Sequence, residues 1–132
     1  MKDERRQVQT ESGILTFPRV RKPTPKVSLW EERRRPDESR LREQLLAGGY
    51  QVVKWTSEPG QAYLPHAHIY PELLWMLTGS ITVILTAEKR MLELGPGDRI
   101  ETPPGMLHAL LVGPDGAEYL IATHLDEETL SR

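Results

Sequence analysis

The sequence predicts an all-β sandwich or barrel, preceded by an N-terminal arm and one short helix. From residue 50 onward, strand-like runs recur: YQVVKWT, ELLWMLT, SITVILTA, RMLEL, DRIET, HALLV and AEYLIATHL. Turn-forming stretches separate them: EPG, TGS, LGPGD, TPPG and VGPDG. Short strands with turn signals at this spacing are typical of small all-β domains. A chain of 132 residues is long enough to form one domain with its own core.

The part of the chain before residue 50 has a different pattern. Its first 12 residues are expected to be frayed or loosely held. ILTFPRV, residues 14–20, has strand-like residues, but Pro18 limits it to an edge strand or an arm. We expect a division into an arm and helix over residues 1–49, a barrel over 50–125 and a tail over 126–132, with the arm belonging to the same domain.

The predicted helix begins at Pro36 or Asp37 and continues through SRLREQLLA. Gly48 and Gly49 follow the last apolar residue and predict its end. One side of the helix is expected to be apolar and to carry three leucines, Leu41, Leu45 and Leu46.

Composition excludes several classes of protein. The chain has no cysteine, so neither a disulfide nor a thiolate metal site is expected. The first residues, MKDERRQVQT, are charged and lack the apolar stretch of a secretory signal. No apolar run approaches the roughly 18 residues that a membrane-spanning helix needs. We therefore expect a cytoplasmic protein without a membrane partner.

Charge is unevenly distributed along the chain. Residues 1–50 carry 12 Lys/Arg against 8 Asp/Glu, whereas residues 51–132 carry 5 against 11. The basic residues are interleaved with acids and no nucleic-acid-binding motif accompanies them, so we expect no nucleic-acid partner. The basic arm is expected to lie on an acidic body, either its own or that of a partner subunit.

The stretch PHAHIYPELLW places two imidazoles, His66 and His68, just before a carboxylate, Glu72, in an apolar run. Side chains at positions i and i+2 share a face only in extended chain. On a straight strand Glu72 would lie roughly 13 Å beyond His68, so the chain must turn for the three to meet. IYP, with Pro71, supplies that turn. The arrangement therefore predicts a hairpin-like fold in which Glu72 begins the next strand.

Two imidazoles and a carboxylate suit a divalent transition metal. With coordination positions left open, they form the ligand set of non-haem iron oxygenases. A bound cation would also offset the cost of burying the charge of Glu72 among apolar neighbours.

A wider motif surrounds these residues. Gly60, His66, His68, Glu72 and Gly79 match the first cupin motif, G-x5-H-x-H-x3,4-E-x6-G, at every defined position. The second cupin motif, G-x5-P-x-G-x2-H-x3-N, is similar to a downstream stretch with four matching positions, Gly97, Pro103, Gly105 and His108. The sequence thus resembles the cupin superfamily over residues 60–112, and its strand pattern does so over about residues 50–125.

The resemblance implies a double-stranded jelly-roll β-barrel that holds one divalent metal ion through His66, His68, Glu72 and His108. It also implies a homodimer, since small cupins often pair through an N-terminal arm. The second motif usually closes with Asn, where this chain has Val112. That departure removes a polar contact and leaves the four ligands in place.

Four further residues are candidates for the pocket: Tyr63, Tyr70, Met76 and His124. The two tyrosines flank the histidine pair and are candidate hydrogen-bond donors. Met76 shares strand parity with Glu72, and either the cavity or the core is open to it. For His124 the alternatives are a role beside the metal and a place on the surface or in the core.

Three functions remain open for a small organic ligand or substrate. The leading hypothesis is a dioxygenase, which is an oxidoreductase. The second is a metal-dependent isomerase, epimerase or lyase that uses the ion as a Lewis acid. The third is a non-catalytic ligand-binding cupin. The ligand set suits Fe, Mn, Ni, Co, Cu or Zn, so the sequence does not select the metal.

Overall fold

The computed structural model describes residues 5–10, 13–18 and 23–124. Its elements in chain order are β1 (Arg5–Thr10), β2 (Gly13–Pro18), β3 (Lys26–Ser28), α1 (Glu38–Ala47), β4 (Gln51–Ser57), β5 (Ala62–His66), β6 (Glu72–Leu85), the short 3-10 helix η1 (Thr86–Glu88), β7 (Arg90–Leu94), β8 (Arg99–Thr102) and β9 (His108–Thr123). Neither helix in this part of the chain is long and apolar enough to cross a membrane.

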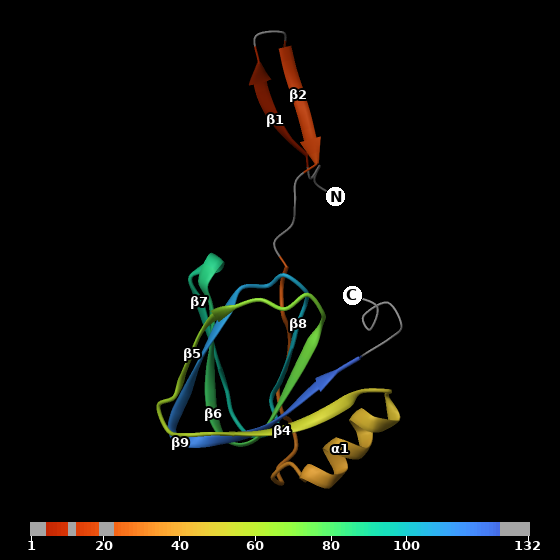
Figure 1. The fold of residues 1–132 in the computed structure, drawn as a ribbon, viewed down its shortest axis with the longest axis vertical. Coiled ribbons are helices and arrows are strands. Elements are labelled where there is room, and N and C mark those ends of the chain that lie inside the picture. Colours follow the sequence, from red (N-terminus) through yellow and green to blue (C-terminus); the bar gives the residue numbers. More distant parts are fainter. Residues whose placement is uncertain (1–4, 11–12, 19–22, 125–132) are drawn as a thin grey trace.

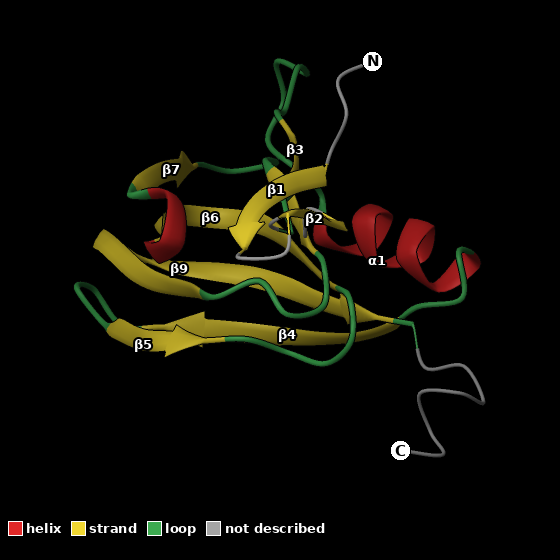
Figure 2. Ribbon diagram, turned by 90° about the horizontal axis from the view of Figure 1, so that it is seen from above, coloured by secondary structure: helices red, strands yellow, loops and turns green. Residues whose placement is uncertain are grey.

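Two long antiparallel strands, β6 and β9, organise the barrel. They pair along nearly their whole lengths, with two shifts of register. The other edge of β6 pairs with β8 and then with β7, and the other edge of β9 pairs with β4 and then with β5. β3 extends the sheet beyond β8. The sheet wraps round an interior, with α1 against the outside (Figures 1 and 2). The predicted all-β jelly-roll class is confirmed.

The continuity of β6 and β9 corrects the expected turns at TGS and VGPDG, because both stretches lie inside a strand. Gly79 and Gly116 both have positive φ, 75° and 76°. A Cβ on Gly79 would overlap the carbonyl oxygen of Gly116. The register also shifts beside Gly79. These glycines therefore allow a close crossing with bulges that bend the strands without ending them.

Three strands were not expected: β1, β3 and β5. Residues 5–10, expected to be loosely held, form β1 and pair with β2 within the same chain. β2 contains most of the predicted arm strand, whose last residues, 19 and 20, lie outside the described part. β5 includes Pro65 and pairs with β9, with an irregularity between Tyr63 and His66. Pro65 is tolerated because it lies at that irregularity in an outer strand.

Helix α1 agrees with its prediction at both ends. A carboxylate oxygen of Asp37 accepts from the amide of Arg40 at 3.3 Å, and the helix ends before Gly48. Leu41 and Leu45 are buried, but Leu46, expected on the same side, is 56% exposed. Positions 41 and 45 are one turn apart, whereas position 46 is rotated away from them.

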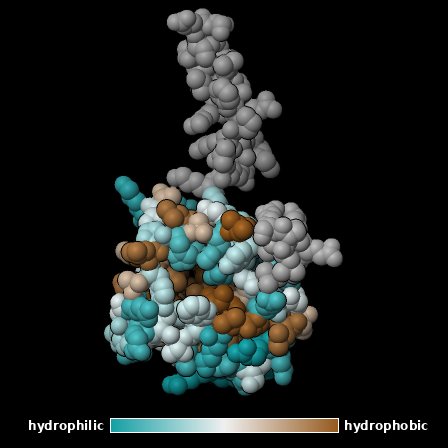
Figure 3. Space-filling view, viewed as in Figure 1, coloured by the Kyte–Doolittle hydropathy of each residue, from teal (hydrophilic) through white to brown (hydrophobic). Residues whose placement is uncertain are grey.

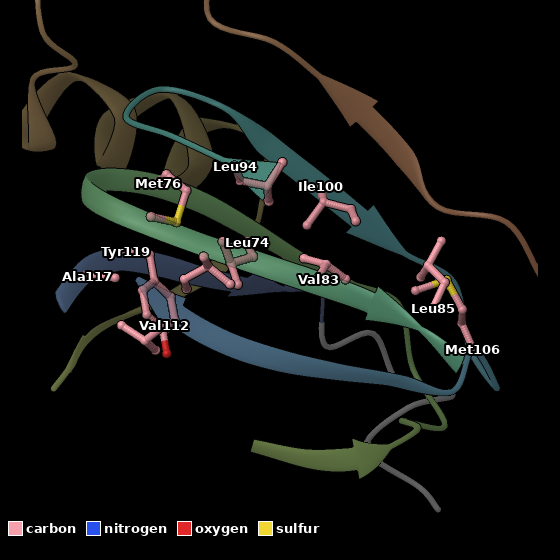
Figure 4. Packing of buried hydrophobic residues seen from close by; sticks show 11 residues of the cluster. Leu74, Met76, Val83, Leu85, Leu94, Ile100, Met106, Val112, Ala117 and Tyr119 are labelled. Atoms are coloured by element: carbon pink, nitrogen blue, oxygen red, sulfur yellow. The ribbon is translucent and has the colours of Figure 1, made fainter. Parts of the chain in front are cut away.

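Alternate residues of β6 serve two cores. Met76 belongs to the inner core and lies near Leu94 and Ile100 in Figure 4. Trp75 belongs to a second core between the sheet and α1. Burial on both faces explains the unbroken apolar run LLWML that follows Glu72. The expected division at residue 49 stays a prediction. β3 pairs with β8, and α1 packs against the outside of the sheet. Residues 126–132, the expected tail, lie outside the described part.

Candidate metal centre

Three imidazole rings converge at one end of the barrel. His66 ends β5, His108 begins β9, and the two are direct cross-strand partners. Their ring centroids lie 4.4 Å apart, and the ring of His68 lies 4.9 Å from His66 and 5.7 Å from His108. One nitrogen from each ring falls within a group whose members are all within 4.8 Å of one another. The three histidines are thus close enough to hold one metal ion.

Backbone carbonyls fix the orientation of two rings. Nδ1 of His66 lies 2.9 Å from the carbonyl oxygen of Leu64, and Nδ1 of His108 lies 2.8 Å from that of Met106. A carbonyl oxygen can only accept, so each Nδ1 carries the proton and each Nε2 keeps its lone pair. This is the state in which a histidine binds a metal through Nε2.

His68 and Glu72 complete the cluster. Nε2 of His68 is buried without a hydrogen-bond partner in the described part of the chain. It lies 3.3 Å from a carboxylate oxygen of Glu72. Glu72 is outside the mutual group formed by the three rings and stands beside it. A buried nitrogen without a partner is costly, and a metal ion would satisfy it. The donor atoms therefore fit the metal that the cupin resemblance implies.

Burial sets the charge state of these groups. It lowers the pKa of His68, with a further contribution from His66. It also lowers the pKa of His108, although the bond to the Met106 carbonyl opposes the shift. Burial raises the pKa of Glu72, against the pull of His108 and His66. The imidazoles of His68 and His108 are thereby held neutral, as metal ligands must be.

The chain reaches Glu72 by a bend, as predicted, but not through a hairpin. Ile69 and Tyr70 form the bend and Glu72 begins β6. However, β5 pairs with β9, while the start of β6 pairs with β8. The loop between β5 and β6 therefore connects strands that pair with different partners, β9 and β8, and we call it the crossing loop. The spacing of strands along the sequence does not predict this connection. The amide of Gly105 donates to the carbonyl oxygen of His68 at 2.8 Å and ties down this loop.

A cavity of about 200 Å³ opens beside the cluster. Its walls contain no lysine or arginine among the described residues and are formed by Trp55, Tyr63, His66, His68, Glu72, Leu110, Tyr119 and Ile121. Figure 3 shows apolar surface around a hollow in the middle of the face turned to the viewer. The cavity can thus hold a small molecule with a largely apolar body beside the metal ligands.

The other predicted pocket residues have separate positions. Tyr63 lines the cavity, whereas Tyr70 stacks on His68 with ring centroids 5.3 Å apart. Met76 is fully buried in the inner core, and Val112 lies in the same core. His124 packs on a tyrosine ring 3.8 Å away, outside the histidine cluster.

A larger hollow of about 420 Å³ is lined by His124, Tyr50 and Glu72 among other residues, but by none of the three clustered histidines. Size alone would select this hollow as the site. We place the candidate site in the smaller cavity because His66 and His68 line it.

Sequence reasoning missed Ser57 and Tyr119. Ser57 Oγ lies 2.7 Å from the hydroxyl of Tyr63 and 2.9 Å from that of Tyr119. Tyr119 alternates with Ile121, which also lines the cavity. Their alternation along the strand indicates that both side chains point to the same face. The sequence does not show that this face is the inner one, because the bulges in β9 change which alternate residues point inward.

Comparison with known proteins finds similarity in structure but not in sequence. No family profile matches the sequence, and no curated protein matches it. The structure resembles the polyketide cyclase RemF from Streptomyces resistomycificus, at 24% identity and TM-score 0.52, over 61% of this chain and 64% of that one. It resembles a cupin superfamily protein from Desulfitobacterium hafniense, at 16% identity and TM-score 0.51, over 81% and 83%.

It also resembles the DMSP lyase DddQ from Ruegeria pomeroyi, at 28% identity and TM-score 0.50, over 61% of this chain and 39% of that one. The match therefore spans less than two thirds of the cyclase and of the lyase. These similarities show that the chain has the cupin fold.

Proposed function

We propose that this chain, a cupin by its fold, binds one divalent metal ion through His66, His68, Glu72 and His108 and acts on a small organic molecule. The observation that carries the proposal is the cluster of three imidazoles beside a cavity, with one nitrogen buried and unpartnered. These residues would hold the ion, which would supply Lewis-acid chemistry toward an oxygen of the substrate.

The side chains around the cluster have distinct tasks. The carbonyls of Leu64 and Met106 orient two imidazoles. Leu110 and Ile121 cover part of the cavity wall, exclude water and contact the apolar part of the substrate. The hydroxyl of Tyr63 is placed to donate a proton or a hydrogen bond to an oxygen-bearing substrate.

We favour a reaction without oxidation, of the lyase or isomerase type. A tyrosine hydroxyl in the cavity wall supplies acid–base chemistry, which such reactions need. The similarity to a lyase at 28% identity also supports this choice, although it covers only part of that protein.

A dioxygenase is the second candidate, because three imidazoles and a carboxylate also suit iron. The cytoplasmic location and the homodimer expected from the sequence stay predictions.

Metal analysis and oxygen dependence separate these functions. Protein purified without added metal is analysed for its elements and then assayed with diketone, catechol and hydroxy-acid panels, in air and under anaerobic conditions. We expect manganese or zinc and turnover that does not require oxygen. Iron with oxygen uptake would replace this proposal by the dioxygenase. A correctly folded protein that binds no metal would leave only a non-catalytic cupin.

A further inference from the structure

Three hydroxyl groups form a chain in the cavity wall. Ser57 ends β4, Tyr63 lies in β5 and Tyr119 in β9, so the chain joins three strands. Ser57 Oγ stands in the middle, 2.7 Å from one tyrosine hydroxyl and 2.9 Å from the other. Both tyrosines line the cavity together with His66 and His68.

Counting protons shows which hydroxyl remains free to donate. Three hydroxyls carry three protons, and the two hydrogen bonds use two of them. Tyr119 is only 2% exposed, and a buried O–H must find an acceptor inside the protein, so Tyr119 donates to Ser57. Ser57 then donates its single proton to Tyr63. The proton of Tyr63, a half-buried residue, is left to point into the cavity.

Tyr119 remains protonated across the physiological range. Burial raises its pKa to about 12, despite the opposing effect of its hydrogen bond with Ser57. Tyr119 therefore keeps the proton that it donates to Ser57 at neutral pH.

We propose that Tyr63 donates a hydrogen bond to a carbonyl oxygen of the ligand, with Ser57 and Tyr119 as positioning residues behind it. The ligand would carry a second oxygen group, such as a carboxylate, at the metal centre, and that part of the inference rests on the proposed function. The contact at Tyr63 is a neutral carbonyl because the cavity wall lacks lysine and arginine among the described residues.

The size and lining of the cavity limit the ligand class. About 200 Å³ is the volume of roughly seven water molecules in the liquid. Leu110, Ile121 and Trp55 line much of the remaining wall. The ligand class is therefore a short oxo acid whose two oxygen groups are joined by an apolar stretch.

Matched probes test this contact directly. Binding of 4-oxopentanoate and 5-oxohexanoate to the zinc-loaded protein is compared with that of 4-methylpentanoate and 5-methylhexanoate, in which a methyl group replaces the keto oxygen. In Tyr63→Phe we expect about a 10-fold weaker affinity for at least one oxo acid and unchanged affinity for its methyl counterpart. Tyr50→Phe, outside this cavity, is the control and should change neither affinity.

A spectroscopic signal tests the positioning role. The chain has four tyrosines, so tyrosine labelled with ¹³C at Cζ gives four resonances. We expect the oxo acid to shift the Tyr63 resonance in the wild type and in Ser57→Thr, and to shift it less in Ser57→Ala. Equal shifts in all three proteins would contradict the role of Ser57.

Different results would contradict the Tyr63 contact and the proposed metal binding. A zinc-loaded wild type in which neither oxo acid shifts Tyr63, or equal affinities in wild type and Tyr63→Phe, would overturn the Tyr63 contact alone. A protein that binds no metal but still shows the Tyr63 shift would overturn the proposed function alone.

Discussion

At the scale of single residues, the sequence predicted the clustered histidines but not the hydroxyl chain. His66 and His68 are only two residues apart and precede the bend, so local spacing determines their approach. Ser57 and Tyr119 meet through the register of β4 on β9, 62 residues apart in sequence. Register depends on the bulges in β9, which a pattern of apolar residues does not reveal.

The buried phenol of Tyr119 predicts a loss of stability in alkali. Its folded pKa, about 12, lies above the ordinary value of 10, so the folded state holds this proton more tightly than the unfolded state. The associated stability is complete below pH 10 and is lost as the pH rises toward 12. We expect the thermal midpoint to fall over this range in the wild type, beyond any fall that Tyr119→Phe shows. Equal falls in both proteins would contradict the raised pKa.

At the scale of elements, two connections align the candidate metal ligands. The crossing loop carries His68, and the loop before β9 carries Gly105, whose amide bonds the His68 carbonyl. The sequence predicted a turn before Glu72 and a bend before His108 from proline and glycine. It did not predict that β6 and β9 run through their glycines, because a glycine permits a turn and a bulge equally well.

The bond between these loops makes Gly105 a test of their alignment. Gly105 has φ 79° with open space around its Cβ position, and Gly60, in the turn before β5, has φ 73° with the same open space. Valine at either position costs about 1–3 kcal/mol of strain. We expect Gly105→Val to weaken metal binding because it displaces His68, and Gly60→Val to bind as the wild type does. Calorimetric titration with zinc measures both, and equal affinities would refute the alignment role.

At the scale of the whole molecule, the barrel brings together residues from distant parts of the chain. His108 reaches its partners because β9 pairs with β5 at its beginning and with β4 at its end. The fold was predictable because the strand-like runs, the turn signals and the two motifs agreed with one another. The path of the crossing loop was not predictable, because it depends on which strands pair with each other. The homodimer stays a prediction.

Metal content per subunit tests the central claim most directly. The wild type, His66→Ala, His108→Ala and His124→Ala are equilibrated with zinc, dialysed and analysed by mass spectrometry of the elements. We predict one ion per subunit in the wild type and in His124→Ala, whose imidazole lies outside the cluster. We predict that His66→Ala and His108→Ala each weaken metal binding more than about 100-fold. That loss is larger than the loss expected for a residue that only hydrogen-bonds a metal ligand. A His66→Ala or His108→Ala protein that keeps its full complement of metal would contradict the account.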